Sequence, residues 1–313
     1  MSRNVNLDLL LERVSPQWEE VIREAKNSLR QGLGMSIQNV MRLSMKAANP
    51  PSSVQVDIAP GYPRVLEQLD IGAWNTQAEH LIVFRKEMEC YLQDGGRILE
   101  GIQTLPELDQ SQSGVRNAWV KSLGESKAIV ERLLRFSVSK SVLKRILEVD
   151  EDILGTYSFE DGKGRVRLYW AVIAFVANSL GVDATDLAMV VLTHELAHAF
   201  THLGGDADGN TWLDFFVRSD RKVLEALAQY YTHSVLFGIN LKGRENGIRH
   251  AYETLTPLQP ETYQRHLGWI NRWQPEAVRA AMLELRNGGV ADLEGFEACI
   301  ESHSERLRVE GLF

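Results

Sequence analysis

The sequence predicts an α+β fold that is predominantly α-helical. Most of the 313 residues lie in long stretches where apolar residues recur every three or four positions, which is the spacing of one helix face. Only two neighbouring runs, 153–159 and 165–170, have the composition of strands, and they flank a glycine-containing turn at 160–164. We therefore expect helices packed around a small β-hairpin or sheet.

The N-terminal part is predicted to be helical. Ser15 and Pro16 are typical of a helix start, and apolar residues then follow at helical spacing. These residues are Trp18, Val21, Ile22, Ala25 and Leu29. Because an apolar stripe needs a surface that covers it, these helices are a candidate docking site for a protein partner.

A linker is predicted at 49–64, where Pro, Ser and Gly are frequent. We accordingly expect a helical N-terminal region at 1–112, with the linker inside it, and a second domain at 113–313 that ends in further helices. Other helices are predicted at 76–102, 119–136, 142–147, 184–202, 222–231, 276–285 and 291–307.

The helix at 184–202 is expected to be buried on most sides. Asp183 or Thr185 can cap its start, no Gly or Pro interrupts it, and Gly204 and Gly205 provide a stop. After Asp186 the run is almost wholly apolar apart from one group of polar residues.

That group is an H-E-x-x-H motif formed by His194, Glu195 and His198. Residues four apart lie on one helix face, so both imidazoles can bind one metal ion while Glu195 lies beside them. Burying these three polar side chains without hydrogen-bond partners would cost several kcal/mol. A bound cation satisfies the imidazoles and favours an ionised carboxylate nearby. The motif therefore predicts one zinc ion and hydrolytic chemistry.

A catalytic zinc usually has three protein ligands, so a third ligand is expected. His202 lies roughly 12 Å from His194 along the helix axis, in one row with His198, and is expected to have a supporting role. Glu225 lies among apolar residues of the predicted helix 222–231 and is our third ligand. Gln229, one turn later, is expected to accept a hydrogen bond from a ligand histidine. The rival carboxylates are Glu151, Asp206, Asp208 and Asp214.

With these residues the chain resembles the zincin metallopeptidases, and Glu225 makes it similar to the glutamate-zincin (gluzincin) branch represented by thermolysin-like enzymes. The resemblance covers about residues 148–238 and includes a hairpin before the motif helix. Leu224 departs from the Asn or Gly that this branch often carries before its third ligand. The resemblance implies a zincin-like core, a protease with a polypeptide substrate, and an edge strand that binds extended chain.

In such an enzyme Glu195 would act as general base and then as acid. A second donor to the tetrahedral oxyanion is also expected. The sequence offers Tyr230, Tyr231, His233, Tyr263 and His266, among which Tyr263 and His266 are selected. The alternatives are a zinc-binding sensor with the same fold and a scaffold protein whose metal only holds the domain together.

Composition limits the partners. A net charge of −8 without a cluster of basic residues argues against nucleic acid. The N-terminus has no signal-like segment, and no apolar run is long enough to cross a membrane, so a cytoplasmic location is expected. Two cysteines, Cys90 and Cys299, indicate neither a disulfide framework nor a thiolate metal site.

Overall fold

The computed structural model describes residues 7–8, 11–12, 14–49, 51–68, 85–104, 110–137, 140–212, 216–238, 243–288 and 292–310. In these ranges the chain is mostly helical and contains one small sheet, which confirms the predicted fold class. The helices are α2 (Gln17–Met41), α4 (Arg85–Gln103), α5 (Gln110–Ser137), α6 (Lys140–Leu147), α7 (Trp170–Leu180), α8 (Ala184–Leu203), α9 (Arg221–Gly238), α10 (Glu245–Leu255), α11 (Glu261–Gln264), α12 (His266–Arg272), α13 (Pro275–Gly288) and α14 (Leu293–Val309). Of the helix predicted at 76–102, residues 76–84 lie outside the described ranges.

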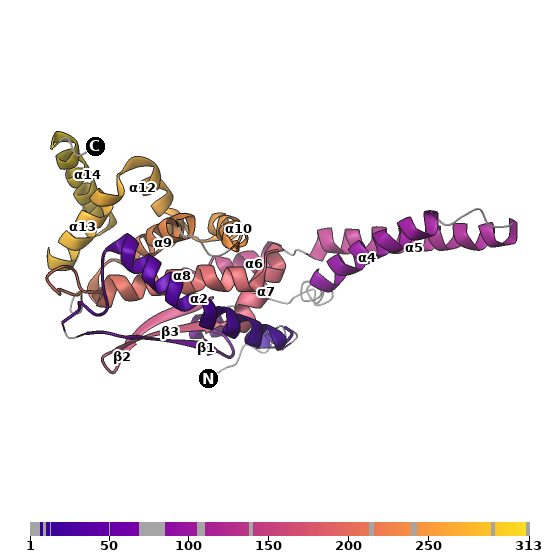
Figure 1. The fold of residues 1–313 in the computed structure, drawn as a ribbon, viewed down its shortest axis with the longest axis horizontal. Coiled ribbons are helices and arrows are strands. Elements are labelled where there is room, and N and C mark those ends of the chain that lie inside the picture. Colours follow the sequence, from indigo (N-terminus) through magenta and orange to yellow (C-terminus); the bar gives the residue numbers. More distant parts are fainter. Residues whose placement is uncertain are drawn as a thin grey trace.

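The sheet has three strands in the order β1-β3-β2, so β2 forms one edge (Figure 1). Strands β2 (Gly155–Glu160) and β3 (Lys163–Tyr169) pair antiparallel and confirm the predicted hairpin. Their turn uses Asp161 and Gly162, both with positive φ, as a tight two-residue hairpin requires. Strand β1 (Val54–Ala59) pairs with β3 in parallel.

Strand β1 occupies the middle of the segment 49–64 that was predicted as a linker. Val56 and Ile58 alternate with more exposed residues and enter the hydrophobic core, which the flanking Pro, Ser and Gly concealed in the sequence. The predicted boundary between 112 and 113 falls in the first turn of α5. Helix α2 packs along α8 and shares its core, so α2 and β1 belong with the motif helix.

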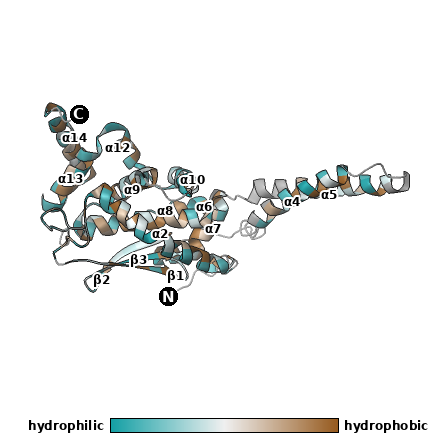
Figure 2. Ribbon diagram, viewed as in Figure 1, coloured by the Kyte–Doolittle hydropathy of each residue, from teal (hydrophilic) through white to brown (hydrophobic). Residues whose placement is uncertain are grey.

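Helix α8 is the centre of the fold, and all of its residues are buried. It lies on strands β2 and β3 and contacts α2, α7, α9 and α10, and hydrophobic residues are frequent along α7 and α8 (Figure 2). Its start agrees with the sequence prediction, because the Asp183 side chain accepts hydrogen bonds from the backbone N–H groups of Thr185 and Asp186. A polar side chain on this helix therefore has little access to water and must find its partners within the protein.

Helices α4 and α5 pair and project away from the rest of the molecule (Figure 1). At the other end of the chain α13 and α14 form a second helical pair, with Phe296 and Ile300 buried as the periodicity predicts. Among the described residues, no helix combines the length and the apolar character that a membrane crossing needs.

Gly205 lies where the end of α8 contacts the segment after α2, and a substitution there tests this contact. Its backbone exchanges two hydrogen bonds with Ser44, and an added Cβ would lie 2.5 Å from the backbone nitrogen of Ala48. We expect Gly205→Ala to lower the free energy of unfolding by about 1–3 kcal/mol, because the backbone must shift. Urea unfolding followed by circular dichroism measures this change.

The matched control is Gly32→Ala in α2, where an added Cβ meets no atom within 4 Å. This change should raise the free energy of unfolding by about 0.5–1 kcal/mol, because alanine is the better helix former. Equal midpoints for the two variants would contradict the close packing at Gly205.

Candidate functional site

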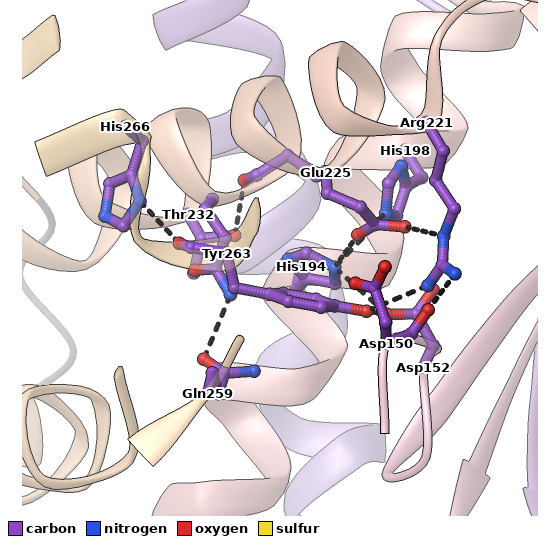
Figure 3. Close-up of polar contacts among 12 residues, drawn as sticks. Asp150, Asp152, His194, His198, Arg221, Glu225, Thr232, Gln259, Tyr263 and His266 are labelled. Carbon is purple, nitrogen blue, oxygen red and sulfur yellow. Dashed lines mark hydrogen bonds and ion pairs between the residues drawn. The ribbon is translucent and has the colours of Figure 1, made fainter. Parts of the chain in front are cut away.

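The site is built where α8 and α9 pack side by side. His194 and His198 lie one turn apart on α8, and Glu225 faces them from α9. These side chains are nearly inaccessible: His194 and His198 are each 6% exposed and Glu225 is 4% exposed. Figure 3 shows all three pointing toward one another. The structure therefore brings together the three residues that were predicted as metal ligands.

The spacing of the three side chains fits a metal ion. The two Nε2 atoms are 3.1 Å apart, and Glu225 Oε2 is 3.3 Å from that of His194 and 3.2 Å from that of His198. Ligand atoms at zinc's usual 2.0–2.1 Å would be about 3.3–3.4 Å apart in a tetrahedron. Two imidazole nitrogens and a carboxylate oxygen are also the donor types that zinc accepts. The donor set and its spacing thus suit a tetrahedral ion.

The electrostatics of the cluster also favour a cation. Burial alone would lower the pKa of His194, but hydrogen bonds with Asp152 and Glu225 and the charges of Asp152 and Glu195 raise it well above its ordinary value. Burial alone would raise the pKa of Glu225, but His198 and His194 hold it well below its ordinary value. The carboxylates therefore create a potential that stabilises positive charge among the three donors.

Asp152 is a fourth potential metal donor at this site, and the sequence prediction missed it. It lies just before β2, and Oδ1 is 3.6 Å from His194 Nε2. The Tyr263 hydroxyl donates a hydrogen bond of 2.8 Å to the same oxygen. Asp152, His194, His198 and Glu225 each offer a ligand atom, and these atoms all lie within 4.8 Å of one another. In this loop the sequence analysis had named only the neighbouring Glu151, as an alternative third ligand.

Arg221 is a second residue that the sequence prediction missed. It precedes Glu225 by one turn of α9, and its Nε donates to Glu225 Oε1 at 3.3 Å. Its guanidinium also donates to the Tyr263 hydroxyl and to the backbone carbonyl of Asp150 (Figure 3). Arg221 thus holds the second oxygen of Glu225 and leaves Oε2 directed at the histidines.

Glu195 lies beside the donors in a tightly packed position. It is 1% exposed, and its Oε2 has no hydrogen-bond partner among the described residues. Burial raises the pKa of Glu195 well above its ordinary value, and the carboxylates of Asp152 and Glu225 raise it further. Gly155 passes so close that an added Cβ would lie 2.8 Å from Glu195 Oε1. Because Gly155 has no side chain, the Glu195 carboxyl can lie against the backbone of β2.

A cavity and a groove adjoin this cluster. The cavity has a volume of about 40 Å³, which exceeds the roughly 10–15 Å³ that a water needs, and His194, Glu195 and mainly apolar residues line it. The groove, of about 860 Å³, follows β2 and is bordered by Tyr157 and Arg221. Asp152 borders both spaces and so lies where they meet.

The predicted contact between Gln229 and a ligand histidine is wrong. The Gln229 amide nitrogen donates instead to Gln259 Oε1, and its own Oε1 has no partner among the described residues. Packing against the 256–260 segment decides this orientation, which helix spacing does not reveal. His202 does not belong to the donor group among the described residues; its Nδ1 contacts the Tyr157 hydroxyl and its ring stacks on Phe216.

Of the two predicted oxyanion donors, the structure brings only Tyr263 to the site. Burial, with the carboxylates of Asp152 and Glu225, raises the pKa of its hydroxyl well above the ordinary value, so it remains a donor. His266 lies on the opposite side of Tyr263 from the cluster (Figure 3). Its Nδ1 donates to the Tyr263 carbonyl and its Nε2 accepts from Tyr252. Burial lowers the pKa of His266 to about 3, so the ring is neutral and structural.

The rival third ligands do not join the metal-donor group in the described ranges. Asp206 accepts hydrogen bonds from the backbone of Asp208 and Asn210 and closes a plain turn. Glu151 is exposed and borders both the cavity and the groove, and Asp214 lies outside the described residues.

Comparison of the chain with protein-family models, with curated proteins and with solved structures finds no match. The function must therefore be argued from the site itself.

The ligand assignment predicts the effect of removing a single donor. We expect His198→Ala and Glu225→Ala each to lose one equivalent of zinc, with affinity reduced about 100-fold or more, because only two of the three assigned ligands remain. Zinc content after dialysis, measured by mass spectrometry, reports the change. The control is His250→Ala, which removes an exposed imidazole on α10 and should keep the parent's zinc content. Parent-like zinc in Glu225→Ala would place the third ligand elsewhere.

Proposed function

We propose that the protein is a zinc-dependent metallopeptidase with a zincin-like core. The observation that carries the proposal is the group of three buried donor atoms, 3.1–3.3 Å apart, with the Glu195 carboxyl beside them. A zinc site held by three protein ligands keeps a position for water, and a neighbouring carboxylate is the usual base for that water.

His194, His198 and Glu225 would hold the ion. When bound, zinc supplies Lewis-acid chemistry, which makes a water more acidic and polarises a carbonyl group. A bound divalent cation would oppose the raised pKa of Glu195 and favour its ionised form. Glu195 would then accept a proton from the attacking water and return it to the leaving amine, because its carboxyl borders the cavity and has one oxygen without a partner among the described residues. The apolar lining of this cavity limits competing bulk water.

The groove along β2 supports a polypeptide as the substrate. Because β2 is an edge strand, it can pair with an extended chain through backbone hydrogen bonds. The groove reaches Asp152 and Arg221, and Asp152 also borders the cavity beside Glu195. A chain bound along β2 would therefore bring its backbone carbonyls close to the proposed metal site.

Tyr263 is the proposed donor to the developing oxyanion. Its hydroxyl is fixed between Asp152 and Arg221, and its ring centroid is 5.9 Å from that of His194. To act on the oxyanion, the hydroxyl would turn its single proton from Asp152 to the substrate oxygen, while the hydrogen bond donated by Arg221 keeps the phenol oxygen in place.

Asp152 favours one alternative, a closed zinc site in a sensor or scaffold protein. Its Oδ1 is 3.6 Å from His194 Nε2, so the chain offers a fourth protein donor, and four protein ligands are typical of structural zinc. The two functions differ in whether Glu195 is required.

The first test is Glu195→Gln. We expect cleavage of a proteome-derived peptide library to slow by about 100-fold or more, with zinc content unchanged, because the amide cannot accept the proton. New peptide N-termini counted by mass spectrometry measure cleavage. Glu253→Gln, which changes an exposed carboxylate on α10, should cut as the parent does. Zinc-loaded parent that cuts no peptide would favour the closed site over the peptidase.

The second test is Tyr263→Phe, which keeps the ring and removes the hydroxyl. We expect kcat to fall about 100-fold, with zinc content and KM nearly unchanged, because the hydroxyl acts on the transition state. Steady-state kinetics on a peptide found in the library measure both constants. Tyr91→Phe, at an exposed position on α4, is the control. An unchanged kcat in Tyr263→Phe would assign the oxyanion donor to another group.

A further inference from the structure

A second group of metal-binding side chains lies between the two C-terminal helices. Glu284 comes from α13, and Cys299 and His303 come from α14. Each offers one ligand atom, and these three atoms lie within 4.8 Å of one another. Glu284 Oε2 and His303 Nε2 are 2.8 Å apart. This group shares no residue with the cluster on α8 and α9.

The arrangement follows from helix geometry. Cys299 and His303 are four residues apart, so their side chains lie one above the other on the same face of α14. The neighbouring helix α13 supplies the third side chain. A thiolate, an imidazole and a carboxylate are all zinc ligands, and the sulfur favours zinc over magnesium or calcium.

We propose that Glu284, Cys299 and His303 form a second divalent-metal site, selective for zinc-like ions, that joins α13 to α14. The site is open to solvent on one side, because the Glu284 side chain is 61% exposed and that of His303 is 18% exposed. Water completes the coordination there. With three ligands and an open face, this site binds more weakly than the buried cluster of His194, His198 and Glu225.

Binding at this site exchanges a proton for the metal. Burial and the neighbouring Glu284 raise the pKa of the Cys299 thiol to about 11, while Arg306 opposes the shift. The thiol is therefore protonated at neutral pH. The divalent ion forms a bond to sulfur and the S–H bond breaks, releasing one proton to water. His303 binds through the Nε2 lone pair with its ring proton on Nδ1, and the ion takes the place of the contact with Glu284.

The structure also makes the two proposed sites separable. The α8–α9 cluster offers only nitrogen and oxygen donors, whereas the α13–α14 group contains a sulfur. A thiolate ligand gives Co²⁺ a sulfur-to-metal charge-transfer absorption in the near ultraviolet, which nitrogen and oxygen ligands do not give. The second site can therefore be tested independently of any peptidase activity.

The experiment titrates metal-free, full-length protein with Co²⁺ and then with Zn²⁺. The parent should develop the sulfur charge-transfer band and lose it when Zn²⁺ displaces Co²⁺. Cys299→Ser should abolish the band and lose one metal equivalent. Cys90→Ser, at an exposed position on α4, should keep the band and the parent's metal content. His198→Ala should keep the band and lose only the metal equivalent held by the α8–α9 cluster. Circular dichroism of each variant checks that it is folded.

Two further measurements test the Glu284 carboxylate and the Cys299 thiol separately. Glu284→Gln should weaken Co²⁺ binding at the sulfur site about tenfold or more, because it removes a charged ligand. Zn²⁺ should slow iodoacetamide alkylation of Cys299 and leave that of Cys90 unchanged. A parent protein without the band, a band that survives in Cys299→Ser, or Cys299 alkylation unaffected by Zn²⁺ would overturn the proposal. Glu284 and His303 would then form only a surface ion pair.

Discussion

Two imidazoles and a carboxylate meet inside the protein with little access to water, and the residues around them are arranged to support that meeting. His194 Nε2, His198 Nε2 and Glu225 Oε2 lie 3.1–3.3 Å apart, and each of the three residues is at most 6% exposed. When each ring carries its proton on Nδ1, the two Nε2 atoms and the Glu225 oxygen all present lone pairs to one another and repel. A cation among the three atoms would satisfy all of them, and under the proposed function the surrounding residues support a metal ion.

Three residues around the cluster hold or make room for its carboxyl groups. Arg221 binds the outer oxygen of Glu225, and Tyr263 joins Arg221 to Asp152. Gly155 allows β2 to approach Glu195 more closely than any other residue would. His266 shows the contrast, because both of its ring nitrogens have protein partners and its role is structural. A buried histidine whose two ring nitrogens both have hydrogen-bond partners within the protein, as in His266, is structural and offers no free nitrogen to a metal ion.

Local signals predicted the elements that local interactions determine. The Asp183 cap, the uninterrupted apolar run and the hairpin turn at Asp161 and Gly162 each act within a few residues, and each appears in the structure. The α8–α9 packing that brings Glu225 to the histidines also follows from a sequence pattern, since Glu225 stands among apolar residues. Strand β1 could not be predicted so directly, because its partner β3 lies about a hundred residues later in the chain. Asp152 and Arg221 were missed for the same reason, since tertiary packing positions the loop before β2 beside the start of α9.

The proposed function requires a single ion between α8 and α9. Anomalous diffraction at the zinc absorption edge, from crystals of the zinc-loaded protein, locates that ion directly. We predict an anomalous peak about 2.0–2.2 Å from His194 Nε2, His198 Nε2 and Glu225 Oε2. Density that shows the two imidazoles turned away from each other, or no peak between these three atoms, would contradict the metal assignment.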